Sequence, residues 1–314
     1  MSKFLITGIC GFVGGYFYEY LKRHAPETIV LGLDIANECM LSGDNFTYRQ
    51  IDLMDRETVH QCIKSFRPDY ILHLASFSSV SQSWKMPAKS FINNTNIFLN
   101  IVEALRSIGS TARVLSIGSS EEYGNSPETM LPLKEDYKLQ PRSPYAIARV
   151  SQEMLSSLYA SSYQLDIIMT RSFNHIGPRQ RDIFVVPSFV HQMVNIAKGR
   201  DKGKLYVGNI DVIRDFLDIR DVVDAYYRIL IHGKTEEVYN VCSGKGTKLR
   251  DIIKETAQQL DIEPEILVDP ARIRPMENMC IIGDNSKLYN DIGWKPHYEL
   301  SKTLQDMISY WQQA

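Results

Sequence analysis

A tyrosine, an arginine and a serine lie in two short stretches whose residue types suit proton transfer. Tyr145 and Arg149 are four residues apart in Ser-Pro-Tyr-Ala-Ile-Ala-Arg, so a helix there would place both side chains on one face. A free phenol has a pKa of about 10 and is a poor acid or base at neutral pH, whereas a neighbouring cation favours the phenolate. Ser119, earlier in the chain, could hold the same substrate oxygen from the other side. The three residues therefore suit the interconversion of an alcohol and a ketone.

A tyrosine and an arginine at this spacing are more often a solvated pair on a helix surface. The catalytic interpretation therefore depends on the elements that would position the pair, and these begin at the N-terminal end of the sequence.

A short apolar run is followed at once by three glycines and then by apolar residues at helical spacing, which is the context of a dinucleotide-binding turn. Gly8 permits the tight turn, Gly11 lets the backbone approach a pyrophosphate, and Gly14 lets the helix pack on the strand. The N–H groups at the helix start, at Phe12 and Val13, would hold the phosphates. The spacing is G-x-x-G-x-x-G and not the plain G-x-G-x-x-G.

Acidic residues follow the next two predicted strands. Asp34 ends the strand at residues 28–33, and a carboxylate about 20 residues after the glycines accepts hydrogen bonds from the adenosine ribose. It would also repel a 2′-phosphate, which favours NAD over NADP without excluding either. Asp52 and Leu53 follow the third strand and are placed to meet the adenine, unless Asp52 caps the following helix.

Two further strands complete the nucleotide-binding half. The strand at residues 69–74 ends beside Ala75, which we expect to lie under the cofactor with Leu74. We interpret His73 as a structural histidine. The strand at residues 113–117 would deliver the serine and Glu121 to the carboxyl edge of the sheet, where ligands bind in open α/β sheets. Strands that alternate with amphipathic helices predict an α/β fold with a Rossmann-type, doubly wound parallel sheet.

Composition excludes several function classes. The chain has 314 residues, 44% of them hydrophobic and 23% charged, and a net charge of -2, so nothing in it favours binding to nucleic acid or membranes. No apolar run reaches the ~18 residues of a membrane span, and we expect a cytoplasmic protein without a signal peptide. The five scattered cysteines fit reduced thiols better than disulfides or a metal site.

With these features together, the sequence resembles the extended short-chain dehydrogenase/reductase family over essentially its full length. The motifs that carry the resemblance are Thr7-Gly8-Ile-Cys-Gly11-Phe-Val-Gly14, Asp34, Asp52, His73-Leu-Ala75, Ser119 with Tyr123-Gly124, and Tyr145. It implies a dinucleotide-binding domain at residues 1–172, with part of 209–238, and a smaller C-terminal α/β substrate-binding lobe at 173–314. It also implies Tyr145 as the proton donor or acceptor, with Ser119 as its helper.

The resemblance also implies two sets of binding residues. The cofactor set is Gly8, Gly11, Phe12, Val13, Gly14, Asp34, Asp52, Leu53, Leu74, Ala75, Asn94, Tyr145, Arg149 and Ser172. The substrate set is Ser119, Ser120, Glu121, Asn174, Val186, Arg214, Arg274 and Glu277. The chemistry of the second set suits a nucleoside diphosphate, because arginines bind phosphates and a glutamate accepts from ribose hydroxyls.

One position departs from the family pattern. The usual Tyr-x-x-x-Lys is Tyr145-Ala-Ile-Ala-Arg149 in this chain. The family lysine binds the nicotinamide ribose and lowers the pKa of the tyrosine. Arginine keeps the charge on a planar fork, and the two residues are not interchangeable at tight sites. We expect Arg149 to take the part of the lysine.

The second half is similar to the GDP-mannose branch of the family, which contains dehydratases and reductases. The runs Phe173-Asn-His-Ile-Gly-Pro178, Arg214-Asp-Phe-Leu-Asp218 and Asp269-Pro-Ala-Arg-Ile-Arg-Pro275 look closest to reductases that form GDP-D-rhamnose. That likeness implies hydride transfer from NADH or NADPH to C4 of a GDP-linked 4-keto-6-deoxy-mannose. Glu121 keeps open a 4,6-dehydratase in which it is the acid/base. Against that alternative, the stretch after the second strand is acidic and short instead of basic.

A function of another class also stays open. Some members of the superfamily bind a dinucleotide only to regulate partners, although such proteins tend to lose the tyrosine. The helices around Asn94 and Tyr145 could pair across a twofold axis as the four-helix bundle of a homodimer. Their apolar faces could equally do no more than cover the sheet.

Overall fold

The computed structural model describes residues 1–273, 276 and 278–314, and its larger part is built on a seven-stranded sheet. All seven strands run parallel, in the order β10-β6-β5-β4-β1-β2-β3. Their bounds are β1 Lys3–Thr7, β2 Ile29–Asp34, β3 Phe46–Gln50, β4 Tyr70–His73, β5 Arg113–Ser119, β6 Ile167–Ser172 and β10 Val238–Val241. The strand order reverses between β1 and β4, and ligands bind at such a switch point. The predicted doubly wound parallel sheet is confirmed.

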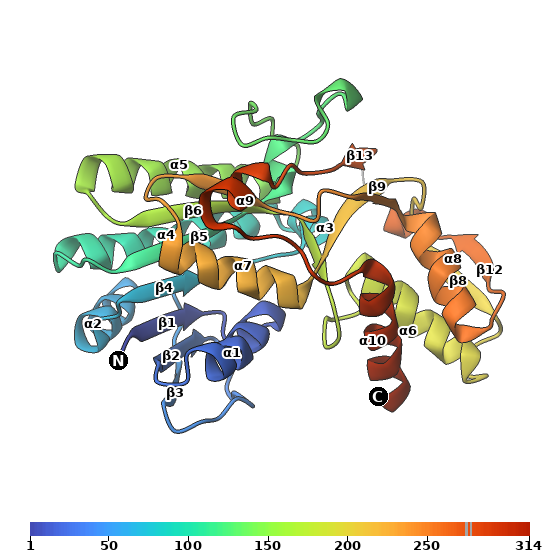
Figure 1. The fold of residues 1–314 in the computed structure, drawn as a ribbon, viewed down its shortest axis with the longest axis horizontal. Coiled ribbons are helices and arrows are strands. Elements are labelled where there is room, and N and C mark those ends of the chain that lie inside the picture. The colour runs from blue at the N-terminus through green and yellow to red at the C-terminus, as the bar shows by residue number, and fades with distance from the viewer. Residues whose placement is uncertain (274–275, 277) are drawn as a thin grey trace.

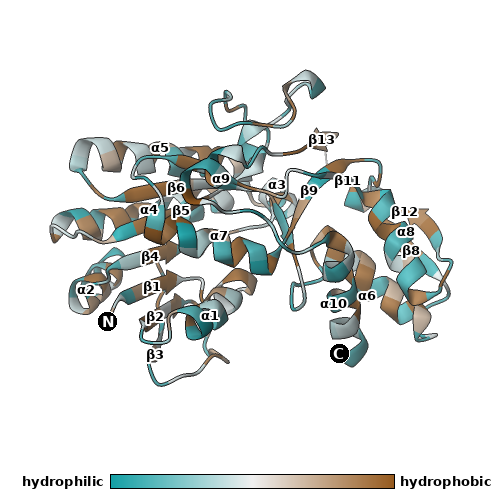
Figure 2. Ribbon diagram, in the orientation of Figure 1, coloured by the Kyte–Doolittle hydropathy of each residue, from teal (hydrophilic) through white to brown (hydrophobic). Residues whose placement is uncertain are grey.

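Helices cover both faces of this sheet (Figure 1). One face carries α1 Phe12–His24, α7 Ile219–His232 and α9 Ser286–Ile292, and the other carries α2 Arg56–Phe66, α4 Pro87–Ser107 and α5 Pro144–Tyr163. Because side chains alternate along a strand, Phe4 and Ile6 of β1 pack toward the first face and Leu5 toward the second. The central strands β1, β2 and β4 are accordingly mostly apolar, which is typical of strands buried on both sides, and Figure 2 shows the hydropathy along the chain.

The start of α5 is fixed by local sequence. Ser143 adopts extended backbone, and its hydroxyl accepts a hydrogen bond from the N–H of Ala146 over 3.1 Å. Pro144 occupies the first helical position, where its missing N–H costs nothing. Tyr145 is therefore held in the first turn of the helix, at the end nearest the carboxyl edge of the sheet.

A smaller α/β lobe follows the large sheet. Its core lies between α6 Val185–Ala197, α8 Leu249–Leu260 and α10 Leu300–Gln313. Its strands are β7 Asn174–Ile176, β9 Ile213–Asp218, β11 Gly246–Lys248 and β13 Cys280–Ile281 in one sheet, with β8 Lys204–Val207 and β12 Glu265–Val268 in a second. The remaining short elements are α3 Val80–Lys85, η1 Ser120–Tyr123, η2 Glu128–Met130 and η3 Pro270–Arg272. The chain returns from this lobe to the large sheet through α7, β10 and α9.

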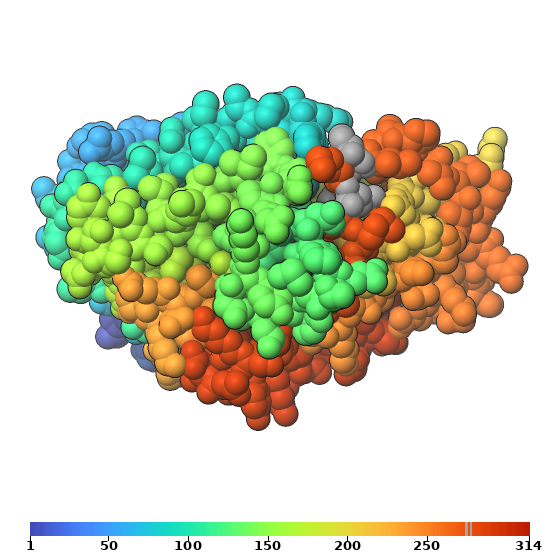
Figure 3. Space-filling view, turned by 90° about the horizontal axis from the view of Figure 1, so that it is seen from above, coloured from blue at the N-terminus to red at the C-terminus, as the bar shows by residue number. Residues whose placement is uncertain are grey.

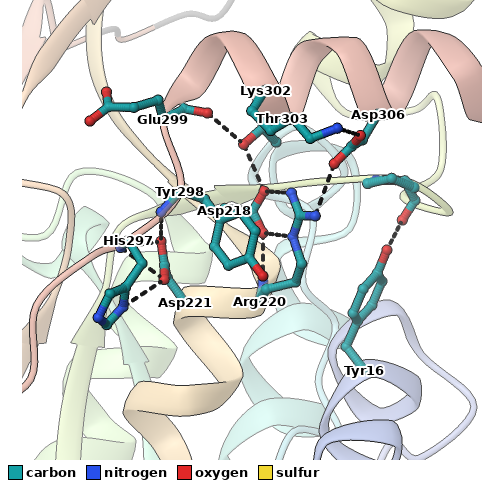
Figure 4. Close-up of polar contacts among 11 residues, drawn as sticks. Tyr16, Asp218, Arg220, Asp221, His297, Tyr298, Glu299, Lys302, Thr303 and Asp306 are labelled. Atoms are coloured by element: carbon teal, nitrogen blue, oxygen red, sulfur yellow. Dashed lines mark hydrogen bonds and ion pairs between the residues drawn. The ribbon is translucent and has the colours of Figure 1, made fainter.

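A buried carboxylate joins the two parts where β9 leads into α7 (Figure 4). Asp218 accepts hydrogen bonds from the N–H of Arg220 at the start of α7 and from the hydroxyl of Thr303 in α10, over 2.8 and 2.6 Å. The Arg220 guanidinium pairs with Asp218 and with Asp306, and it stacks over the ring of Tyr298 at 3.8 Å. These contacts attach the C-terminal helix α10 to the start of α7, one of the helices that cover the large sheet.

Three expectations from composition concern what the described residues contain. None of the described helices is both long and apolar enough to cross a membrane. Within the same residues, no group of three or more potential ligands is arranged to hold a metal ion. All five cysteines are free thiols.

Candidate active site

The phenol of Tyr145 and the guanidinium of Arg149 are in direct contact. Arg149 Nε donates a hydrogen bond to Tyr145 Oη over 3.1 Å, and both side chains are buried, with 4% of Arg149 and 7% of Tyr145 exposed. A buried cation–phenol pair differs from the solvated pair that is common on helix surfaces. The predicted contact on one helix face is confirmed.

A second nitrogen of the Arg149 guanidinium joins α5 to β5. Its Nη1 donates to the carbonyl oxygen of Ile117 over 2.9 Å and to Gln152 Oε1 over 2.8 Å. Gln152 in turn donates to the hydroxyl of Ser116 over 2.9 Å. The arginine therefore fixes the phenol relative to the carboxyl end of β5, two residues before Ser119.

Ser119 ends β5 and begins the 3-10 helix η1. Its hydroxyl accepts a hydrogen bond from the N–H of Glu121 over 3.3 Å. Ser119 and Ser120 are buried, and Glu121 is half-buried. Since η1 packs against α5, the serine and the carboxylate lie on the same edge of the sheet as Tyr145.

The glycine turn packs so closely on neighbouring backbone that its three glycines have little or no room for a side chain. Gly8 has a φ of 70°, and a Cβ there would lie 2.8 Å from the backbone nitrogen of Ala75. A Cβ at Gly11 would meet Gly8 O at 3.0 Å, and one at Gly14 would meet Ile9 O at 2.5 Å. No side chain caps the first turn of α1, so its N–H groups at Phe12 and Val13 point to a site for phosphate. The turn therefore fits a dinucleotide pyrophosphate.

Asp34 is bound to the glycine turn itself. Its Oδ2 accepts from the N–H of Cys10 over 3.0 Å, and its Oδ1 accepts from the N–H of Ala36 over 3.2 Å. Asp52 accepts from the N–H of Met54 and does not cap α2, which Asp55 caps through Thr58. The capping alternative for Asp52 was therefore wrong, and its place beside an adenine stays a prediction.

Buried polar side chains support the floor of this site. Thr7 Oγ1 accepts from the N–H of Leu74 and Ala75 over 3.2 Å each and contacts His73 Nδ1 at 2.9 Å. Burial, and then the positive charge of Arg149, lower the pKa of His73 to about 3, so the ring is neutral. Asn94 in α4 accepts from the N–H of Phe77 over 2.6 Å and so fixes the loop after Ala75.

The other predicted contact residues are held by protein partners. Ser172 is hydrogen-bonded to Tyr226 Oη at 2.6 Å, and the backbone of Leu53 accepts from Asn100 over 2.8 Å. In the lobe, Asn174 Nδ2 donates to Asp215 O over 3.5 Å, Arg214 donates to Ile213 O over 2.9 Å, and Val186 is fully buried in the core. Arg274 and Glu277 lie outside the described residues.

One polar cluster was not predicted. Glu122, which is fully buried, accepts from the N–H of Ser119 over 2.5 Å, while Arg171 forms a bidentate pair with Glu153 and also donates to Tyr123 Oη. The Ser119-Ser-Glu-Glu122 spacing is that of a capping box, which the structure forms, and Gly118 leaves room for the Glu122 carboxyl. The approach of Glu153 and Arg171 had no signal in the sequence, because it joins η1, α5 and β6 only in the folded chain.

A long segment between η1 and α5 lies beside the last part of the chain. Leu133 N donates to Ile282 O over 2.8 Å, and Asp284 N donates to Leu133 O over 2.9 Å. In Figure 3 this segment, drawn in green, lies against the orange and red C-terminal residues. The two hydrogen bonds therefore join the segment that leads into α5 to the residues that follow β13.

Comparisons with known proteins show what the whole chain is similar to. A family model described as GDP-mannose 4,6 dehydratase matches residues 5–307. A GDP-6-deoxy-D-mannose reductase of Pseudomonas aeruginosa is 34% identical over 99% of this chain and 97% of its own length. A structure of RMD from Pseudomonas aeruginosa complexed with NADPH is similar to this chain with a TM-score of 0.87 and 31% identity, over 100% of this chain and 99% of that one. A UDP-glucose 4-epimerase of Thermus thermophilus in complex with NAD has a TM-score of 0.88 at 27% identity, over 99% of each chain.

Proposed function

The chain belongs to the GDP-mannose 4,6 dehydratase family, and from that premise we propose that it reduces the C4 ketone of GDP-4-keto-6-deoxy-D-mannose to GDP-D-rhamnose. The observation that carries this proposal is the buried Tyr145–Arg149 contact, joined to the carboxyl end of β5. The similarity to a reductase over 99% of the chain supports the direction of the reaction.

The chemistry needs one hydride and one proton. A bound NADH or NADPH would supply the hydride for the ketone carbon, and the ketone oxygen then needs a proton. The O–H of Tyr145 gives its proton to that oxygen, and solvent returns a proton to the phenolate. Arg149 stabilises the phenolate that forms, and Ser119 donates to the substrate oxygen. Arg149 also takes the place of the family lysine at the nicotinamide ribose.

The glycine turn supports the coenzyme assignment. It leaves no room for a Cβ at Gly8 or Gly14, and the start of α1 has no side-chain cap, so the pyrophosphate is held by backbone N–H groups at Phe12 and Val13. Asp34 receives the adenosine ribose, with Asp52 and Leu53 beside the adenine. Leu74, Ala75, Asn94 and Ser172 line the nicotinamide side. Residues 1–172, with part of 209–238, form this domain.

The GDP moiety is assigned to the lobe at residues 173–314. Asn174 and Arg214 contact the diphosphate, and the backbone at Val186 closes the pocket. Arg274 and Glu277 complete the same set in the proposal. The carboxylate of Glu121, with Ser120, orients the sugar.

The protein is proposed to be a cytoplasmic homodimer. Apolar side chains are exposed on α4 and α5, and pairing both helices with those of a second copy would form a four-helix bundle. The exposed side chains are Phe91, Ile92, Ile147, Met154 and Leu158. Five free thiols suit a reducing compartment.

The reaction is tested with the pure protein and two substrates. GDP-4-keto-6-deoxy-D-mannose with NADH or NADPH should be consumed with loss of the absorbance of the reduced coenzyme, and GDP-mannose alone should be stable. Consumption of GDP-mannose without a partner enzyme would favour the dehydratase, with Glu121 as acid/base. Coenzyme binding without turnover of either sugar nucleotide would favour the alternative that the protein is a non-catalytic regulator that binds a dinucleotide.

The role of the phenol is tested by Tyr145→Phe, which should lower kcat by about 10²–10⁴-fold with coenzyme affinity retained. Tyr163→Phe at the end of the same helix is the matched control and should leave turnover unchanged. A Tyr145→Phe variant that keeps most of its turnover would contradict the assignment.

A further inference from the structure

Glu122 is a glutamate in an unusual place, fully buried beside the predicted catalytic serine. Its Oε1 accepts a hydrogen bond from the N–H of Ser119 over 2.5 Å. A Cβ at Gly118 would lie 2.5 Å from this same oxygen and 2.4 Å from Thr170 O. The carboxyl therefore occupies space that exists because residue 118 has no side chain.

If Glu122 is ionised, two carboxylates lie beside a single guanidinium. The groups that face it are the Glu153 carboxyl from α5 and the Arg171 guanidinium from β6. Arg171 forms a bidentate pair with Glu153, over 2.8 and 2.9 Å, and its Nη1 donates to Tyr123 Oη and to Glu135 O. The cation is thus already committed to one carboxylate, and a second negative charge would have no partner of its own.

Protonation of the Glu122 carboxyl would remove this second negative charge. Among the described residues, no N–H or O–H group donates to the buried Oε2 of Glu122. The Glu122 carboxyl faces that of Glu153, and two carboxyls can share a hydrogen bond only when one of them is protonated. Burial and the nearby Glu153 charge raise the pKa of Glu122 well above its ordinary value.

We propose that Glu122 is a positioning residue whose neutral carboxyl is hydrogen-bonded to Glu153 and holds the backbone of Ser119. Through that contact it sets where the Ser119 hydroxyl lies at the end of β5. The inference rests on the proposed reduction, in which Ser119 donates to the substrate oxygen.

The proposal predicts a loss of function and stability on the alkaline side. Because the pKa of Glu122 is higher in the folded than in the unfolded protein, its contribution to stability is complete below the unfolded value and is lost as pH rises through the folded value. Ionisation would then place two negative charges beside one guanidinium and displace the start of η1.

The test compares Glu122→Gln and Glu122→Leu with the wild type in kcat against pH, using GDP-4-keto-6-deoxy-D-mannose and reduced coenzyme. Glutamine keeps an acceptor for Ser119 and a donor for Glu153 without titrating, so it should retain kcat at neutral pH and remove the alkaline inflection due to Glu122. Leucine removes the acceptor and should lower kcat on the order of tenfold or more, with little change in the KM for coenzyme.

A second readout needs no turnover. The melting temperature of the wild type should fall with rising pH more steeply than that of Glu122→Gln. Asp221→Asn, which removes another buried carboxylate, one bound to the backbone of His297 and Tyr298, should leave the shape of the kcat profile unchanged. Superimposable wild-type and Glu122→Gln profiles, or full kcat in Glu122→Leu, would overturn the proposal. A wild type without turnover would instead refute the proposed reduction.

Discussion

Arg149 Nε lies 3.1 Å from Tyr145 Oη, while Nη1 of the same guanidinium lies 2.9 Å from the carbonyl oxygen of Ile117. One side chain thus holds the phenol and anchors helix α5 to strand β5. A lysine ammonium is a point charge on a flexible stem and does not provide the same planar fork. Arg149 therefore both fixes the position of the Tyr145 phenol and places a positive charge beside it.

The first prediction concerns that arginine. Arg149→Lys should keep part of the activity because the charge remains, whereas Arg149→Met should lower kcat by about 10²-fold or more because neither charge nor anchor remains. Steady-state kinetics at saturating coenzyme measure both. Gln152→Leu tests the anchor alone and should have a smaller effect than Arg149→Met. Equal activity of Arg149→Met and Arg149→Lys would show that the cation has no part in the reaction.

Asp34 gives the second prediction. Its carboxylate holds the N–H groups of Cys10 and Ala36, and its charge would face the 2′-phosphate of NADPH. We expect NADH to have the higher kcat/KM, and Asp34→Ala to shift the NADH:NADPH ratio toward NADPH on the order of tenfold or more, since a like-charge contact costs several kcal/mol. Asp52→Ala, at the end of the next strand, is the comparison. A wild-type preference for NADPH would contradict this role of Asp34.

The sequence predicted the parts of this protein that local pattern controls. The strand–glycine–helix order at Gly8 and the four-residue spacing of Tyr145 and Arg149 both depend on residues close in sequence. By contrast, the cluster of Glu122, Glu153 and Arg171 depends on contacts between η1, α5 and β6. The Ser119-x-x-Glu122 spacing predicts a capping box, but no pattern within one element signals that Glu153 and Arg171 lie beside it, so that part could be recognised only in the folded chain.

The third prediction concerns acid stability. The Glu103 carboxylate in α4 accepts hydrogen bonds from Arg106 and from the hydroxyl of Tyr159 in α5, and these contacts lower its pKa to about 2. Because the folded value is lower than the unfolded one, the stabilisation is complete above the unfolded pKa of 4.5 and is lost as pH falls toward 2. We expect a loss of about 1–3 kcal/mol in the free energy of unfolding across that window.

Urea unfolding of the wild type and Glu103→Gln at a series of pH values measures this loss. At neutral pH the variant should be less stable, and the difference should shrink as the wild-type carboxylate is protonated. Glu57→Gln, a surface glutamate of α2, serves as the control. A constant difference between wild type and Glu103→Gln at every pH would mean that ionisation of Glu103 contributes nothing.

The last prediction concerns the exposed apolar face of α5. Met154 and Leu158 are 68% and 49% exposed and lie four residues apart, so they share one side of the helix. In the proposed four-helix bundle they would be buried against a second copy, and a carboxylate there would be desolvated without a partner. Leu158→Glu should therefore convert the dimer to a monomer in light scattering at micromolar concentration. Val268→Glu, at a 60% exposed residue of the other lobe, should leave the mass unchanged. A wild type that is monomeric, or a Leu158→Glu variant that remains dimeric, would remove α5 from the interface.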